Sequence, residues 1–243
     1  MKVYVYEDLN ELYQRVAQVF IDQINEKPNA VLGLATGSTP IGIYEKMIEN
    51  YNEGKSDYSQ VKTINLDEYL GLSGDHPASY GYFMNEYLFS KVNLKKENIN
   101  LLDGKTKDVV KTCEAYENLI NTLGIDVQLL GIGSNGHIAF NEPGTSFESV
   151  THLTQLTENT LKDNSRFFED IKDMPTQALT MGLKSIMSAK KIVLVALGKN
   201  KAHAIWGTLN NGVSKEFPAT ILKNHPNVEI YLDKDAASLI EEK

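Results

Sequence analysis

The chain has 243 residues, of which 24 are basic and 32 acidic, and its net charge is −8. Apolar residues make up 42% and charged residues 23%, which is typical of a globular protein and excludes disorder as the dominant state. The negative charge repels phosphate and argues against non-specific nucleic-acid binding. The sequence has no signal peptide and no run of about 18 apolar residues that would suit a membrane span, so we expect a cytoplasmic protein.

Short apolar segments alternate with longer amphipathic segments along the chain. The pattern predicts six strands, at Lys2–Tyr6, Ala30–Ala35, Val61–Leu66, Val127–Ile132, Lys191–Leu197 and Val228–Leu232. A helix is expected after Asp8, which is spaced with Glu11 as a capping box, and another from Pro40, which suits a first helical turn. Mostly apolar strands separated by helices predict a doubly wound, Rossmann-like α/β fold, with a mostly parallel sheet covered by helices on both faces.

We expect residues 1–243 to form a single domain. The segment from Gly144 to Met174 departs from the alternation, because it is polar, lacks strand periodicity and contains only short helical pieces. An irregular insertion of this length is more often a mobile lid or a binding loop than a plain surface excursion, although the sequence leaves both interpretations open.

Ligands of open parallel sheets bind beyond the carboxyl ends of the strands, so the residues after each strand are site candidates. The second predicted strand is followed by a glycine and hydroxyl side chains that lead into a helix, namely Ala35, Thr36, Gly37, Ser38 and Thr39. Such a segment can bind an anion through backbone N–H groups at the start of the helix, although it lacks the Gly-Lys-Ser/Thr of a P-loop. A capped turn without a ligand explains the same residues equally well.

The glycines of residues 131–136 match the dinucleotide fingerprint formally, but Pro143 and Gly144 stop any helix that would follow. We therefore expect no nicotinamide or flavin cofactor. In the same loop His137 has a suitable position for proton transfer near neutral pH, and Glu142 could orient its imidazole.

Further candidates carry charge. Asp67 ends the third predicted strand and could act as a general base, although a turn or capping role is the more common one for such a residue. Arg166, inside the 144–174 insertion, and Lys201, after the fifth strand, could bind an anionic substrate. The five histidines lack the spacing of a zinc site, and Cys113, the one cysteine, is expected to be a buried thiol in a helix.

With these residues assembled, the sequence resembles the glucosamine-6-phosphate deaminase family, in its short-chain branch. The match runs almost from end to end and rests on six motifs, at residues 32–40, 66–69, 76–80, 136–143, 164–168 and 199–202. The resemblance implies conversion of glucosamine 6-phosphate and water to fructose 6-phosphate and ammonia, in amino-sugar catabolism, without a metal or an organic cofactor. The implied partner is a small sugar phosphate rather than a nucleic acid or a membrane, and monomer and homo-oligomer both stay open.

The resemblance also implies a role for each site residue. His137 would open the sugar ring, Glu142 would hold and tune that histidine, and Asp67 would move a proton from carbon 2 to carbon 1. The phosphate would bind to residues 35–39 and be clamped by Arg166 and Lys201. Asn135 stands where long-chain members have an aspartate that assists ring opening, and its amide could only hydrogen-bond and position.

Long-chain members also bind N-acetylglucosamine 6-phosphate at an allosteric site rich in basic residues. The corresponding stretch here, Ser149–Thr154, has no lysine or arginine, so we expect no such activation. Two alternatives remain. A 6-phosphogluconolactonase would have no need of a carbon-2 base at Asp67, and a non-catalytic sugar-phosphate sensor usually carries a separate DNA-binding module.

Overall fold

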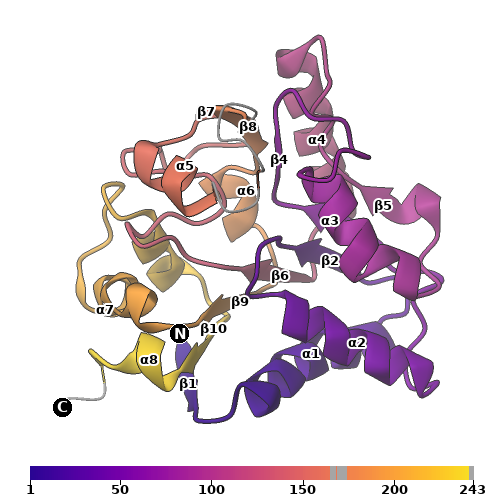
Figure 1. The fold of residues 1–243 in the computed structure, drawn as a ribbon, viewed down its shortest axis with the longest axis horizontal. Helices are drawn as coiled ribbons and strands as arrows, with labels where there is room; N and C mark the ends of the chain where they lie inside the picture. Colours follow the sequence, from indigo (N-terminus) through magenta and orange to yellow (C-terminus); the bar gives the residue numbers. More distant parts are fainter. Residues whose placement is uncertain (165–167, 169–173, 241–243) are drawn as a thin grey trace.

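The computed structural model describes residues 1–164, 168 and 174–240 (Figure 1). Its central sheet has seven strands in the order β1-β10-β9-β6-β2-β3-β5, and every neighbouring pair is parallel. The strands are β1 (Lys2–Tyr6), β2 (Val31–Leu34), β3 (Lys62–Asn65), β5 (Ile99–Asn100), β6 (Val127–Leu130), β9 (Lys191–Ala196) and β10 (Val228–Asp233). All six predicted strands are confirmed. The sequence missed β5, whose two residues are too few to show a periodicity.

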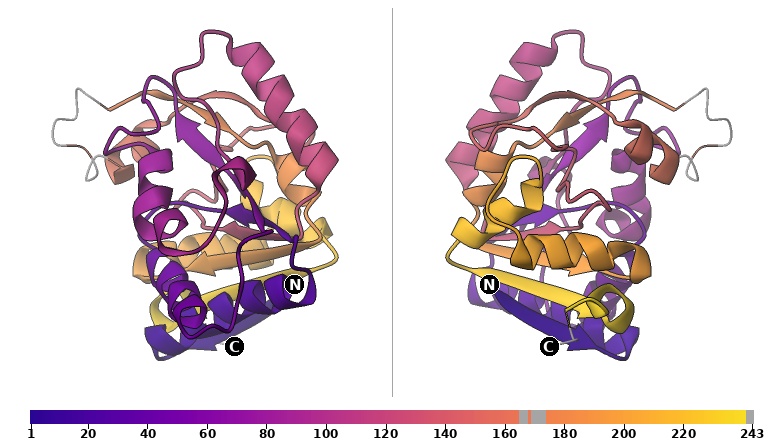
Figure 2. Two further views of the ribbon diagram at one scale, coloured as in Figure 1. Left: turned by 90° about the vertical axis from the view of Figure 1, so that its right-hand side faces the viewer. Right: turned by 90° about the vertical axis from the view of Figure 1, so that its left-hand side faces the viewer.

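Helices cover both faces of this sheet, as predicted (Figures 1 and 2). The helices are α1 (Leu9–Glu26), α2 (Ile41–Asn52), α3 (Tyr80–Tyr87), α4 (Val109–Leu123), α5 (Glu158–Asn164), α6 (Leu183–Met187), α7 (Ala202–Asn210) and α8 (Lys234–Ala237). The connections through α1 and α2 step one way along the sheet and the connection through α7 steps the other way. Because parallel crossovers are right-handed, α1 and α2 pack together on one face and α7 lies on the opposite face.

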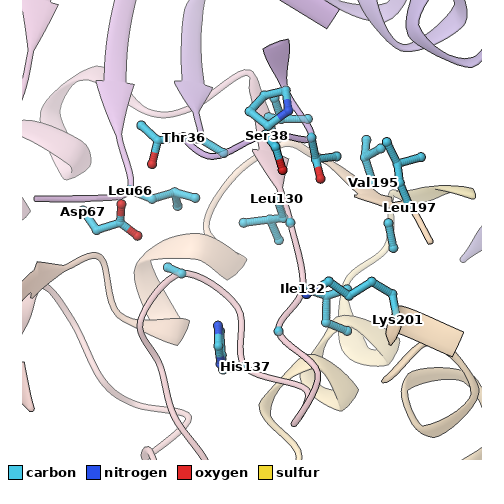
Figure 3. Close-up of a pocket in the computed structure, with 18 of the residues that line it drawn as sticks. Thr36, Ser38, Leu66, Asp67, Leu130, Ile132, His137, Val195, Leu197 and Lys201 are labelled. Atoms are coloured by element: carbon cyan, nitrogen blue, oxygen red, sulfur yellow. The ribbon is translucent and has the colours of Figure 1, made fainter. Parts of the chain in front are cut away.

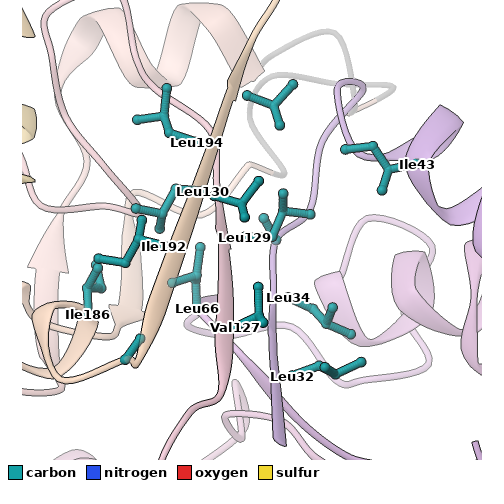
Figure 4. Close-up of a cluster of buried hydrophobic side chains, with 14 of the residues drawn as sticks. Leu32, Leu34, Ile43, Leu66, Val127, Leu129, Leu130, Ile186, Ile192 and Leu194 are labelled. Carbon is teal, nitrogen blue, oxygen red and sulfur yellow. The ribbon is translucent and has the colours of Figure 1, made fainter. Parts of the chain in front are cut away.

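The core forms where the central strands meet these helices (Figure 4). Every residue of β2 and β6 is buried, which explains why these strands are not alternating in hydropathy. Each fully buried leucine or isoleucine stabilises the fold by about 1.5–3 kcal/mol relative to an exposed one. Asp8 caps α1 as expected, since its carboxylate accepts the N–H groups of Asn10 at 2.6 Å and Glu11 at 3.3 Å. Cys113 is buried in α4.

A second, antiparallel sheet was not predicted. It consists of β4 (Asp67–Tyr69), β8 (Gln177–Thr180) and β7 (His152–Gln155), with β8 in the middle. The expectation that residues 144–174 lack a strand is therefore wrong, because β7 lies within them. This strand has only four residues and no fully buried one, so its apolar signal is weak. The predicted lid movement of the segment stays a prediction.

The two sheets are joined through Leu66. Its N–H donates to Leu34 of β2 at 3.2 Å, and its carbonyl accepts the N–H of Met181, just after β8, at 2.7 Å. The chain thus leaves the large sheet at Asn65 and enters the small one at Asp67. We expected Asp67 to end the third strand. It instead begins β4. In the described part of the chain, no helix is both long and apolar enough to cross a membrane.

Candidate active site

A pocket of about 350 Å³ lies beyond the carboxyl ends of β2, β3, β6 and β9, within the range of small-molecule sites (Figure 3). Thr36 and Ser38 lie on one side of this pocket and His137 on the other, while Asp67 and Lys201 lie at its two ends (Figure 3). The structure therefore brings together residues that are up to 165 positions apart in the sequence because the fold gathers the ends of parallel strands.

The carboxyl of Asp67 is buried at the junction of the two sheets, with 8% of the residue exposed. Burial penalises the charged form, and the neighbouring Glu68 carboxylate adds repulsion, so that the pKa of Asp67 is raised to about 8. Asp67 lies in a strand and not in the turn or helix cap that we considered, and burial at this position raises its pKa. A buried carboxyl that faces a pocket in this way can exchange a proton with a bound molecule near neutral pH.

Glu68 has a different environment, although it is the next residue in the chain. Its carboxylate points away from solvent and accepts three backbone N–H groups, from Tyr69 at 2.9 Å, Tyr80 at 3.0 Å and Gly81 at 2.9 Å. These bonds fix the start of α3, where Tyr80 lines the pocket. Burial raises the pKa of Glu68, and the three hydrogen bonds oppose that rise. Sequence reasoning assigned Glu68 no role, although its motif was among the six that carry the resemblance.

His137, Glu142 and Asn135 form a connected group. Nδ1 of His137 lies 3.4 Å from Oε2 of Glu142, a contact without hydrogen-bond geometry that becomes an ion pair when the imidazole is protonated. The Asn135 amide donates to the same Oε2 at 2.9 Å and accepts the backbone N–H of His137 at 3.2 Å. Burial alone would raise the pKa of Glu142, but the contact with His137 and the hydrogen bonds from Thr160 and Asn135 lower it to about 2. The carboxylate therefore stays charged beside the imidazole.

The glycines of this loop make close packing possible. A Cβ atom at Gly133 would lie 2.2 Å from Cε1 of His137, so the imidazole lies directly against the backbone of that glycine. Gly136 has a φ of +82°, which favours glycine. Residues 131–157 contain no helix, so the loop does not have the structure that a dinucleotide fingerprint requires.

The predicted anion-binding segment lies where β2 meets α2. Gly37 has a φ of +103°, and Pro40 precedes the first turn of α2 without a side-chain cap. The Tyr44 hydroxyl fixes the segment by donating to the carbonyl of Ala35 at 2.6 Å and accepting its N–H at 3.2 Å. Ser38, Thr39 and Pro40 line the pocket at the start of this helix, an arrangement that favours an anion site.

Lys201 lines the pocket from the short 3₁₀ turn Lys199–Lys201, whereas Lys199 is exposed. The turn is fixed because the N–H of Gly198 donates to both carboxylate oxygens of Asp233, at 2.8 and 3.0 Å. Arg166 lies outside the described residues. Across the described chain, no three acidic, histidine or cysteine side chains are grouped so that they could hold a metal ion.

The structure adds two pocket residues that sequence reasoning did not single out. Tyr80 stacks on Phe140 with ring centroids 6.2 Å apart, and its hydroxyl donates to that of Tyr69 at 3.2 Å. Thr160 donates its hydroxyl to Oε1 of Glu142. Tyr80 is part of a motif that carried the resemblance and could have been found there. Thr160 lies in the irregular insertion, where no sequence signal marks it.

Comparison with known proteins places these features in a family. The family described as glucosamine-6-phosphate isomerases/6-phosphogluconolactonase matches residues 7–231. A protein of Thermoanaerobacter pseudethanolicus named glucosamine-6-phosphate deaminase is 52% identical over 100% of this chain and 96% of its own length. A protein of the same name from Clostridium novyi is 49% identical over 98% of this chain and 99% of its own.

Solved structures agree with this assignment. A monomeric glucosamine-6-phosphate deaminase matches with a TM-score of 0.96 and 45% identity, over 98% of this chain and 100% of that one. The 6-phosphogluconolactonase of Trypanosoma brucei has a TM-score of 0.79 and 22% identity, over 98% and 97% of the two chains, which is a likeness of fold alone. On the full-length identity and the family match, the chain belongs to the glucosamine-6-phosphate isomerase/6-phosphogluconolactonase family.

Proposed function

We propose that this chain is a glucosamine-6-phosphate deaminase, which converts glucosamine 6-phosphate and water to fructose 6-phosphate and ammonia. The observation that carries the proposal is the buried Asp67 carboxyl, which lines the same pocket as His137. Two acid–base groups of different character suit a reaction with separate proton transfers to oxygen and to carbon. The full-length relatives that are about half identical bear the name of this activity, whereas the lactonase is a much more distant relative.

Substrate binding begins in this proposal at the phosphate. The backbone of residues 36–39 and the start of α2 offer N–H groups to its oxygens, and Lys201 supplies positive charge from the end of the pocket opposite Asp67. Arg166 is the second cation that we propose for the phosphate. In a protein with a net charge of −8, these local charges attract the anionic substrate.

Ring opening follows at His137. The imidazole moves a proton from the anomeric hydroxyl to the ring oxygen, which breaks the bond between the ring oxygen and carbon 1 and leaves an open-chain aldehyde. Glu142 orients the imidazole of His137 through its contact with Nδ1. Asn135 donates a hydrogen bond to Glu142 and so positions it without taking up a proton.

Isomerisation uses Asp67. The carboxylate removes the proton from carbon 2 while one proton of the substrate ammonium passes to the carbonyl oxygen, giving an enolamine. It then returns its proton to carbon 1, giving a ketimine that water hydrolyses to fructose 6-phosphate and ammonia. This step needs the charged form of a group whose pKa the protein raises to about 8. The protonated amine of the substrate lies on the same carbon, and an adjacent positive charge lowers the pKa of a carboxyl. Substrate binding thus favours the form of Asp67 that accepts the proton.

The test is ammonia release from glucosamine 6-phosphate by the purified protein, beside an Asp67→Asn variant, with no metal added. We expect release by the parent protein and a loss of at least about 100-fold in the variant, because the amide cannot accept the proton. Activity that survives in the variant would keep the reaction and remove Asp67 as the base. Hydrolysis of 6-phosphogluconolactone without ammonia release would contradict the proposed reaction and leave the fold assignment intact.

A further inference from the structure

The carboxylate of Glu142 is held from both sides. Its Oε2 accepts the Asn135 amide at 2.9 Å and lies 3.4 Å from Nδ1 of His137. Its Oε1 accepts two hydroxyls, that of Thr157 at 3.1 Å and that of Thr160 in a short hydrogen bond. Glu142 is 7% exposed, so water does not readily replace any of these partners.

The two threonines form a small unit of their own at the start of α5. The hydroxyl of Thr157 lies 3.1 Å from that of Thr160 and accepts the N–H of Thr160 at 3.3 Å. Thr160 is 2% exposed and lines the pocket. Thr157 lies just before α5 and Thr160 in its first turn, 15 and 18 positions from Glu142. The position of α5 is thereby tied to one oxygen of Glu142, while the other oxygen faces His137.

We propose that Thr160, supported by Thr157, is a positioning residue for ring opening: its hydroxyl holds Oε1 of Glu142 so that Oε2 faces His137. The inference rests on the proposed function, in which His137 moves the proton. Both threonines donate their hydroxyls to Glu142 and not to Nδ1 of His137, so they act on the imidazole through the glutamate. A glutamate side chain has three rotatable bonds, and hydrogen bonds to both oxygens restrict it to one orientation.

Replacing Thr160 by valine removes the hydroxyl and keeps the volume nearly unchanged. Oε1 then faces a methyl group in a buried place, which is costly for a charged oxygen. The carboxylate turns toward its remaining donors, and Oε2 moves away from His137. Misplacing a catalytic group by about 1 Å can cost on the order of 100-fold in rate.

The experiment compares the parent protein with Thr160→Val, Thr160→Ser and Thr208→Val. Thr208 is a matched control, because it is fully buried and donates its hydroxyl to Ala204 within α7, outside the pocket. We expect kcat for ammonia release to fall about tenfold or more in T160V while KM changes less than about threefold. T160S keeps the hydroxyl and should recover most of kcat, and T208V should retain the parent kcat.

A crystal structure of T160V supplies a readout that does not depend on activity. We expect the distance from Oε2 of Glu142 to Nδ1 of His137 to lengthen from 3.4 Å while α5 stays folded. An unchanged Glu142 carboxylate in that structure would overturn the inference, and so would a T160V variant with the parent kcat. A T160S variant as impaired as T160V would overturn it too, because the hydroxyl would then not be the feature that matters.

Failure of the proposed function is recognised separately. A parent protein that releases no ammonia from glucosamine 6-phosphate contradicts that function, whatever the variants do. The position of Glu142 in T160V still decides the positioning role in that case. Ammonia release by the parent with an unmoved Glu142 in T160V leaves the deaminase proposal standing and removes the role of Thr160.

Discussion

Asp67 and Glu142 are two buried carboxyls of one site whose pKa values are shifted in opposite directions. Burial beside another carboxylate raises the pKa of Asp67 to about 8. Glu142 is also buried, but contact with His137 and hydrogen bonds from Thr160 and Asn135 lower its pKa to about 2. Two carboxyls whose pKa values are this far apart can have different roles: Asp67 can exchange a proton, while Glu142 remains a fixed charge.

The raised pKa of Asp67 predicts how activity depends on pH. A general base must be unprotonated in the free enzyme, so kcat/KM should fall as the pH drops below about 8, approaching tenfold per pH unit. The measurement is kcat/KM for ammonia release between about pH 6 and about pH 9. A profile that stays flat across this range would contradict the assignment of Asp67 as the base.

The same shift predicts an effect on stability. Because the folded pKa of Asp67 lies above its ordinary value of 3.8, the folded protein keeps this proton while the unfolded chain releases it, and the unfolding free energy falls as the pH rises from about 3.8 to about 8. An Asp67→Asn variant has no such ionisation. Its unfolding free energy, measured by urea denaturation, should therefore decrease less than that of the parent protein between acidic and alkaline pH, and an equal decrease in both proteins would contradict the buried position of the charge.

A substitution at Gly133 should also lower kcat. The Cβ of a Gly133→Ala variant would lie 2.2 Å from the imidazole of His137, so the ring must move. We expect kcat to fall by roughly 10- to 100-fold without loss of the fold. Gly212→Ala is the control, since its Cβ would meet nothing within 4 Å. Equal kcat values for both variants would show that the imidazole can shift without consequence.

At the scale of elements, the small antiparallel sheet brings the parts of the site together. Its first residue is Asp67, which is paired with Thr180 of β8. The Thr180 hydroxyl accepts the N–H of Phe140, and the Asn141 amide donates to the carbonyl of Met181 at 2.8 Å. The loop that carries His137 is thereby bound to the same sheet as Asp67, which fixes one relative to the other.

A substitution at Glu68 should loosen the start of α3 and lower the stability of the protein. A Glu68→Gln variant keeps the volume, but its NH₂ group cannot accept the N–H groups that both carboxylate oxygens now accept. Leaving a buried N–H without a partner should destabilise the protein by about 1–3 kcal/mol, measured by denaturant unfolding. Glu86→Gln on the exposed face of α3 is the control and should change stability little. Similar losses in both variants would exclude the anchoring role.

At the scale of the whole molecule, the stretch Ser149–Thr154 bears on regulation. The N–H of Thr151 and its hydroxyl donate to Glu117 of α4, at 3.0 and 2.8 Å, and the Ser185 hydroxyl donates to the same oxygen at 2.7 Å. A carboxylate thus takes the donors that an anion would need there, and it repels a phosphate.

This arrangement predicts an enzyme without activation by N-acetylglucosamine 6-phosphate. The initial rate should depend hyperbolically on glucosamine 6-phosphate, and adding N-acetylglucosamine 6-phosphate should not lower the substrate concentration at half-maximal rate. Sigmoidal kinetics that become hyperbolic on addition of N-acetylglucosamine 6-phosphate would contradict this expectation. The measurement needs only the parent protein and an assay for released ammonia.

Local sequence patterns are enough to predict the large sheet and the edge of that sheet where the site lies. Continuous apolar segments such as Val127–Ile132 indicate strands buried on both faces, and parallel strands bring the residues that follow them to one edge. Asp67, His137 and the segment 35–39 could be found by that rule, and the proline after His137 excluded a dinucleotide fold. The strand inferences succeed because they depend on local patterns and on the handedness of parallel connections.

Which of these residues interact, and how their surroundings shift their pKa values, depends on how the chain packs. The strands β4, β7 and β8 are short and pair across long sequence separations, so their partners and not their own residues stabilise them. The pKa of Asp67 arises from burial at the junction of two sheets. The hydrogen bond from Thr160 to Glu142 joins residues 18 positions apart. Desolvation and side-chain contacts of this kind are properties of the packed molecule, and no local sequence pattern contains them.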